Sequence, residues 1–136
     1  MDKEVEKNYN YWRDVQRKQL GISANLFLLF ATATLGYIID LLIKKEIEIK
    51  CSEKTILIIG ISFLIISLLF YSIFTLNRLF DFRKTAQLYR NGNSTKEVNE
   101  LTQKNGQYTW YLFYGQVLFV GLAFIMCLVG LGMIIF

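Results

Sequence analysis

Three long stretches of this sequence carry almost no charge, and they constrain its fold more than any other feature. They cover residues 20–43, 55–77 and 108–136, and Asp40 is the one charged residue in them. A helix needs about 20 apolar residues to cross a hydrocarbon layer of about 30 Å. Membrane strands are about 10 residues long and alternate apolar with polar side chains, unlike these stretches. We therefore predict three transmembrane helices.

The composition agrees with a membrane protein. Hydrophobic residues make up 54% of the chain and charged residues 19%, whereas about a quarter of an ordinary soluble domain is charged. A chain of 136 residues is too short to bury three such helices in a water-soluble core. We predict an all-α fold, an integral membrane helical bundle that forms one domain over residues 1–136. We also expect it to have helical cytoplasmic extensions and to form a homo-oligomer in the lipid bilayer.

The distribution of Lys and Arg predicts the orientation. Of the 15 basic residues, four lie in residues 44–54, and the others lie in residues 1–19 and 78–107. Cytoplasmic loops of membrane proteins are enriched in Lys and Arg. We therefore expect a multi-pass protein of the bacterial inner membrane, with a cytoplasmic N-terminus and the C-terminus outside. The expected segments are a cytoplasmic helix (1–19), a first span (20–43), an outer loop (44–54), a second span (55–77), a cytoplasmic helical hairpin (78–107) and a third span (108–136).

Local signals predict how the polar segments fold. Residues 2–19 have acidic residues early and basic residues late, which suits the helix dipole, and we favour a helix continuous with the first span over an in-plane amphipathic anchor. Asn91 and Gly92 are a natural helix stop. Ser94 and Glu97 have capping-box spacing and predict a new helix from Thr95. The pair Asn105-Gly106 either ends that helix or bends it. Asp40 can reach water or pair with Lys44 at i+4.

The sequence offers little material for catalysis. Histidine is absent, which excludes histidine-metal sites and Ser-His-Asp triads. There is no P-loop, no dinucleotide-binding glycine motif and no spacing of metal ligands. Cys51 and Cys127 are expected at different depths, too far apart for a disulfide. We predict no enzyme activity, no cofactor, no metal and no nucleic-acid partner.

Polar and small side chains inside the apolar stretches are the first set of candidate functional residues. Small residues let membrane helices approach closely, and amides and hydroxyls bond between helices. These residues either pack the three helices of one subunit, or pack one subunit against another with a polar path between them. Because three helices enclose little space, conduction would require an oligomer. The candidates for a polar path or helix contacts are Asn25, Thr32, Thr34 and Gln116, and those for small-residue packing are Gly36, Gly121, Ala123, Cys127, Gly130 and Gly132.

A basic surface on the cytoplasmic side is the second candidate. Positive-inside topology and attraction to anionic lipid account for it without a further partner. It could also bind a signal ligand or a soluble cytoplasmic protein. In a helix its members spread over several faces, so we expect them to form a basic vestibule only around a symmetric ring. The candidates are Arg78, Arg83, Lys84 and Arg90.

The chain resembles the SLATT-type membrane effectors of bacterial antiphage defence. The likeness is architectural and covers residues 1–90, through the N-terminal helix with the sequence NYWRD (10–14), the hairpin of the first two spans, and the sequence RLFDFRKTA (78–86). The resemblance implies a pore that depolarises the membrane when a partner senses infection. Our first hypothesis is therefore an oligomeric pore-forming or channel-like effector. The alternative is a non-conducting membrane anchor or accessory subunit that recruits a soluble partner.

Overall fold

The protein is a bundle of long helices. The computed structural model describes residues 2–44 and 48–136, and this part of the chain forms α1 (Lys3–Ile43), α2 (Cys51–Arg90) and α3 (Thr95–Ile135) with no strand. The three helices have 41, 40 and 41 residues, so each is about 60 Å long. All three are long and apolar enough to cross a membrane. The predicted all-helical architecture with three candidate spans is confirmed.

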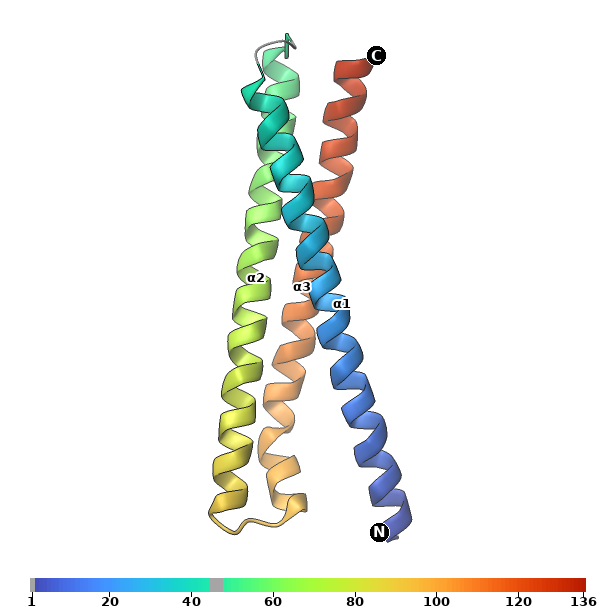
Figure 1. The fold of residues 1–136 in the computed structure, drawn as a ribbon, viewed down its shortest axis with the longest axis vertical. Helices are drawn as coiled ribbons and strands as arrows, with labels where there is room; N and C mark the ends of the chain where they lie inside the picture. Colours follow the sequence, from blue (N-terminus) through green and yellow to red (C-terminus); the bar gives the residue numbers. More distant parts are fainter. Residues whose placement is uncertain (1, 45–47) are drawn as a thin grey trace.

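The helices run up, down and up. The N-terminus and the turn between α2 and α3 lie at one end of the bundle, and the C-terminus lies at the other end beside the start of α2 (Figure 1). Each helix continues well beyond its apolar stretch at the end that holds the N-terminus. We call the polar parts of the helices there (residues 3–19, 78–90 and 95–107) the polar extension. The expected continuity of the N-terminal helix with the first apolar stretch is confirmed, and Asn105-Gly106 does not end α3.

The turn between α2 and α3 forms where the sequence predicts it. Gly92, at the turn, has a φ of 84°, a conformation that glycine adopts without steric cost. The backbone amide of Glu97 donates to Ser94 Oγ (3.4 Å), and the amide of Ser94 donates to Glu97 Oε2 (3.0 Å). At the opposite end of the bundle, Lys44 Nζ pairs with Asp40 Oδ2 at 2.8 Å, and this contact raises the pKa of Lys44.

α2 and α3 pack closely along a seam with heptad-like spacing. The buried residues of α2 follow one another at steps of three and four, from Leu57 through Gly60, Leu64 and Ser67, which is the spacing of a coiled-coil seam. The facing seam of α3 includes Ala123, Cys127 and Gly130. A Cβ atom at Gly130 would lie 2.8 Å from Leu57 Cδ2. Small side chains therefore set the close approach of these two helices.

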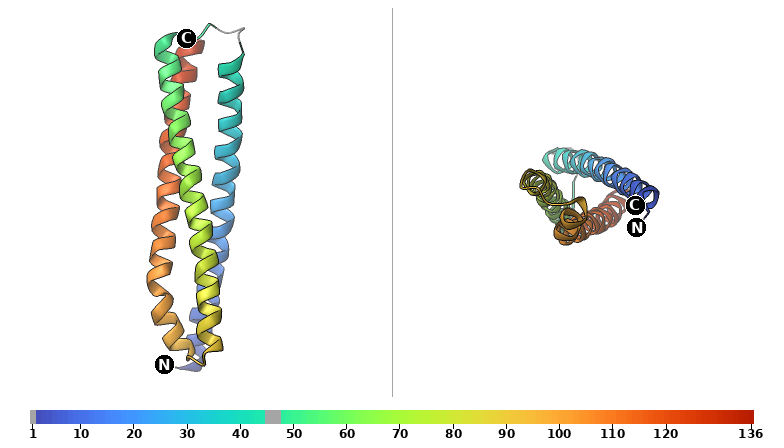
Figure 2. Two further views of the ribbon diagram at one scale, coloured as in Figure 1. Left: turned by 90° about the vertical axis from the view of Figure 1, so that its left-hand side faces the viewer. Right: turned by 90° about the horizontal axis from the view of Figure 1, so that it is seen from below.

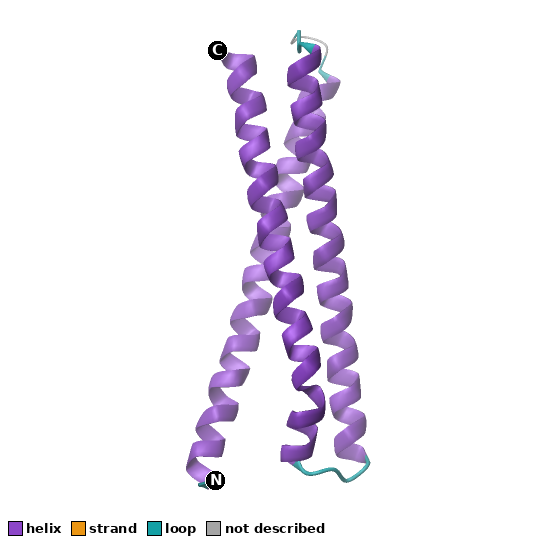
Figure 3. Ribbon diagram, turned by 180° about the vertical axis from the view of Figure 1, so that it is seen from behind, coloured by secondary structure: helices purple, strands orange, loops and turns teal. Residues whose placement is uncertain are grey.

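α1 is attached more loosely. It crosses the α2–α3 pair obliquely (Figure 2), and its N-terminal part diverges from the other two helices (Figures 1 and 3). Its buried contacts are made by Ala24, Ala31 and Ile38, with Leu20 at the edge of the polar extension. In the most apolar 18-residue segment of each helix, 11% of the residues are buried in α1 and 22% in α2 and in α3. Most of the surface of α1 is therefore available to lipid or to another molecule.

The close packing of α3 on α2 gives a stability test. We expect Gly130→Leu to destabilise the bundle by about 1–3 kcal/mol, because the new side chain overpacks the seam against Leu57. Gly132→Leu is the matched control, since a Cβ there meets nothing within 4 Å. Unfolding of the detergent-solubilised protein by sodium dodecyl sulfate, followed by circular dichroism, gives both free energies. Equal effects of the two substitutions would contradict this packing.

Candidate functional site: a basic cleft in the polar extension

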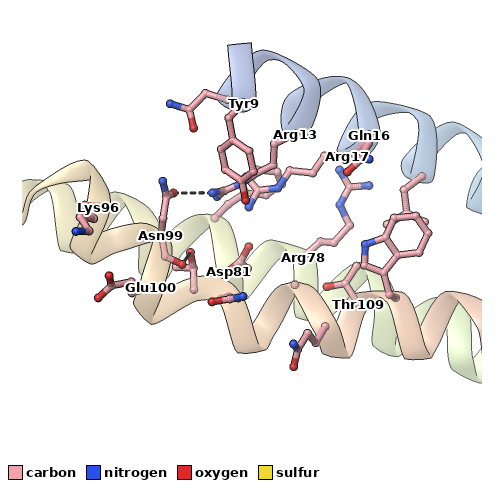
Figure 4. Close-up of a pocket in the computed structure, with 18 of the residues that line it drawn as sticks. Tyr9, Arg13, Gln16, Arg17, Arg78, Asp81, Lys96, Asn99, Glu100 and Thr109 are labelled. Carbon is pink, nitrogen blue, oxygen red and sulfur yellow. Dashed lines mark hydrogen bonds between the residues drawn. The ribbon is translucent and has the colours of Figure 1, made fainter. Parts of the chain in front are cut away.

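A cleft of about 660 Å³ lies where α1 diverges from the α2–α3 pair. Most of its lining comes from the polar extension of all three helices (Figure 4). Leu20, Thr109 and Trp110 line it at the boundary with the apolar stretches, and Glu6 and Lys96 line it farther out. The cleft therefore runs from the end of the polar extension, near the starts of α1 and α3, to the boundary with the apolar part of the bundle.

Three arginines point into this cleft. Arg13 and Arg17 project from α1, and Arg78 projects from α2 towards them (Figure 4). Arg13 Nη1 donates to Asn99 Oδ1 at 2.6 Å, which ties α1 to α3. In residues 2–44 and 48–136, no carboxylate oxygen lies within 4 Å of any of the three guanidinium groups. The positive charges thus converge without a direct ion pair.

The position of Arg78 depends on its neighbours. Its guanidinium carbon lies 5.7 Å from the centre of the Phe74 ring and 5.8 Å from that of Phe82, which is within the range of a cation–π contact. The group also lies against Gly21 of α1, where a Cβ atom would come within 2.5 Å of Arg78 Nη1. The missing side chain of Gly21 therefore leaves the room that Arg78 occupies.

The surroundings of Arg17 disfavour its charge. Burial is the main cause that lowers the pKa of Arg17, followed by the positive charge of Arg13, with a smaller contribution from Arg78. Asp81 and Asp14 act in the opposite direction without cancelling the effect. An arginine stays protonated in any protein, so the cleft holds partly desolvated positive charge. An anion placed there would be stabilised.

A polar network supports the cleft from the α2–α3 side. Asn77 Nδ2 donates to Thr109 Oγ1 at 3.0 Å, and Thr109 Oγ1 donates to the carbonyl of Asn105 at 2.9 Å. Asn105 Nδ2 in turn donates to Asp81 Oδ1 at 3.5 Å. These contacts join α2 and α3 directly beneath the arginines. They hold the wall of the cleft while leaving the guanidinium groups exposed to it.

The structure does not bring the four predicted polar residues together in one chain. Gln116 is buried, and its Nε2 donates to the carbonyl of Ala24 at 3.1 Å. Asn25 is exposed and accepts from the hydroxyl of Tyr71 at 2.7 Å. Thr32 and Thr34 each donate to carbonyls one turn earlier in α1. Gln116 thus joins α1 to α3 inside the bundle, whereas Asn25 and Thr32 face outwards.

The six small residues divide into two groups. Ala123, Cys127 and Gly130 are buried against α2, and Cys127 Sγ would lie 3.0 Å from a Cβ atom at Gly60. A Cβ atom at the other three positions would meet nothing within 4 Å, so their small size is not used within one chain. This second group is Gly36, Gly121 and Gly132. Cys51 and Cys127 are both free, so the expected absence of a bridge between them is confirmed.

Of the predicted basic surface, Arg78 alone lines the cleft. Arg83, Lys84 and Arg90 are exposed on other faces of α2. Sequence reasoning missed Arg13 and Arg17 as partners of Arg78. The signal that could have found them is the spacing from Arg13 through Arg17 and Leu20 to Ala24, which continues the buried face of α1 at steps of four, three and four.

Comparison of the chain with protein-family models, with curated proteins and with solved structures gives no match. In the described part of the chain, no group of three or more Cys, Asp or Glu side chains is placed to hold a metal ion. The lining of the cleft has amide and aromatic groups, four basic side chains and three carboxylates. The basic side chains exceed the carboxylates by one, and this excess of positive charge suits binding of an anion.

The contact between α1 and α3 in the cleft gives a second test. We expect a double-mutant cycle of Arg13→Ala and Asn99→Ala to show a coupling free energy of about 1 kcal/mol, because a charged donor bonds a half-buried amide. The free energies of unfolding of the full chain in detergent supply the four corners of the cycle. A coupling indistinguishable from zero would mean that α1 does not lie against α3 in this way.

Proposed function

We propose that this protein is an oligomeric, pore-forming or channel-like effector of the bacterial inner membrane that acts in antiphage defence. The observation that carries the proposal is an exposed stripe on α1 formed by Asn25, Thr32 and Gly36. These residues are seven and four positions apart, so they share one face of the helix, and all three are exposed. That face belongs to the apolar stretch of α1, where lipid would be its neighbour.

Polar and small groups on such a face favour contact with something other than lipid. Hydrocarbon offers no hydrogen bonds, so polar side chains in membrane helices usually face other helices or a water-filled space. Gly36 has open space around it, which lets another helix approach closely. Packing of this stripe against a second copy of the chain accounts for both features. Closed rings are a common arrangement for identical subunits.

A conducting path would lie between copies and not within one. The interior of the three-helix bundle is filled at the level of Gln116 by Ala24, Val120 and Ser67, which are all at most 3% exposed. Repeated around a ring, the stripe of Asn25 and Thr32 could instead line a polar path. The polar extension, with its basic cleft, would be the part that receives a signal from the cytoplasm.

A non-conducting anchor or accessory subunit that recruits a soluble partner is the second candidate function. It is favoured by the exposed apolar and aromatic side chains of the polar extension, including Trp12 (63% exposed), Leu79 (63%) and Phe80 (62%). Large apolar groups that stand in water often mark a contact surface for another protein. In this case the membrane helices would fix the position of the complex without moving ions.

Ion flux from liposomes tests the first candidate. We expect the reconstituted full chain to release ions, and Asn25→Leu with Thr32→Val to lower the flux by about tenfold or more, because they remove polar groups from the path. Thr34→Val is the matched control, since Thr34 bonds to the carbonyl of Phe30 on another face of α1. Unchanged flux in the double variant would show that the stripe does not line the path. No flux from an oligomer of established size would favour the anchor.

Thiol labelling tests the proposed orientation, with the N-terminus cytoplasmic and the C-terminus outside. Cys51 is exposed and Cys127 is buried. We expect a membrane-impermeant maleimide to label Cys51 once the outer surface of the inner membrane is accessible. In a Cys51→Ser background, Arg90→Cys should react only after the inner membrane is permeabilised, because residue 90 lies at the opposite end of α2. If Arg90→Cys reacts before permeabilisation and Cys51 only after it, the protein has the opposite orientation.

A further inference from the structure

The inner end of the basic cleft lies at the boundary between the polar extension and the apolar stretches, where lipid headgroups would be. Arg17 precedes the first apolar stretch by a few residues, and Arg78 directly follows the second, so both guanidinium groups belong to the boundary. Leu20 and Trp110 line the cleft beside them. Trp is enriched at the interface between membrane and water because it has an apolar body and a polar edge. The inner end of the cleft thus combines positive charge with apolar and aromatic surface.

The donors that face the cleft suit an oxyanion. A guanidinium group is a rigid fork of N–H donors that matches two oxygens of a phosphate. Arg13 uses one nitrogen for Asn99, and in the described residues Arg17 and Arg78 have neither a carboxylate within 4 Å nor a side-chain hydrogen bond. The acidic groups of the lining are Glu6, Asp81 and Glu100. Asp81 already accepts from Asn105.

We propose that this cleft binds the phosphate of an anionic phospholipid, with Arg17 and Arg78 holding its oxygens and Arg13 completing the positive site. The acyl chains would leave the cleft past Leu20 and Trp110 and run along the apolar part of α1. Basic pockets between membrane helices are known to hold anionic headgroups. This site does not depend on the proposed function, since an anchor and a channel could both bind lipid there.

A lipid explains the position of the cleft better than a soluble anion does. A small phosphate ester needs only the charged groups, and those could lie anywhere on the polar extension. Here Arg78 instead lies between the rings of Phe74 and Phe82 and against Gly21, at the boundary of the apolar stretch. Apolar lining next to the charges is what a ligand with both a phosphate and acyl chains requires.

Fluorescence titration of the full chain tests the proposal. Trp12 is exposed and does not line the cleft, so Trp12→Phe leaves Trp110 as the reporter. In a neutral maltoside detergent, short-chain phosphatidylglycerol should change the Trp110 emission saturably. Short-chain phosphatidylcholine and glycerol phosphate should each bind about tenfold more weakly, because the first lacks net negative charge and the second lacks acyl chains. Equal affinity for either probe would overturn the assignment of an anionic lipid.

Matched variants locate the binding in the cleft. Arg17→Gln with Arg78→Gln should weaken phosphatidylglycerol binding by about tenfold or more, since each removes charged hydrogen bonds. Arg83→Gln with Arg90→Gln removes the same charge from exposed positions of α2 and should change the affinity by less than about twofold. Equal losses in the two pairs would mean that the attraction is general surface charge, and the proposed site would be wrong.

A third variant keeps every charge and is expected to fold, so that a loss of binding can be assigned to the cleft. Gly21→Ala adds a Cβ atom 2.5 Å from Arg78 Nη1, so the guanidinium group must move. Alanine also favours a helix over glycine by about 1 kcal/mol, so the far-UV circular dichroism should keep its helical intensity. We expect phosphatidylglycerol to bind several-fold more weakly. An unchanged affinity in this variant would show that Arg78 does not hold the phosphate at this position.

Discussion

Satisfaction of backbone hydrogen bonds without water is the constraint on which this structure depends. In a hydrocarbon layer each unpaired amide or carbonyl group costs several kcal/mol, so a chain crosses it either as helices or as a closed barrel of strands, and only a helix pairs these groups within one segment. Proline is absent from the sequence, and the three helices run without a break through their apolar stretches and into the polar extension. Each helix therefore continues unbroken beyond its apolar stretch, and there α1 and the α2–α3 pair form the walls of the cleft.

The packing seams explain why the cleft forms where it does. Inside the apolar part, the seam positions of α1 are occupied by small residues such as Ala24 and Ala31, which are fully buried against the other two helices. Where the seams enter the polar extension, the same heptad-like spacing places Arg17 on α1 and Arg78 on α2. Two guanidinium groups cannot pack as two methyl groups do, and their charges repel one another. The divergence of α1 from the pair follows from this change of residue type along one continuous seam.

The sequence predicts what is set locally and misses what depends on helix crossing. The three apolar stretches, the capping box at Ser94 and the turn at Gly92 are all readable because each is decided by a few adjacent residues. The cleft is not, because it requires Arg13, Arg17 and Arg78 to meet across helices. Most residues of the apolar stretches are hydrophobic on every face of the helix, so hydropathy does not reveal which face packs. The sites of close approach, such as Gly21 against Arg78, emerge only once the helices are placed in space.

The two proposals concern different faces of the same helix. On α1 the arginines of the cleft continue the buried face that holds Ala24 and Ala31, whereas Asn25 and Thr32 lie on the exposed face. A ligand that contacts Arg17 and Arg78 at once would fix the spacing between α1 and α2 at the polar end. Because α1 is one unbroken helix, that spacing also sets the tilt of its apolar part relative to α2. In the proposed assembly, this tilt would determine how the exposed stripe meets a neighbouring copy. Under the two proposals, anion binding in the cleft and assembly through α1 would thus be mechanically linked by the rigidity of a single helix.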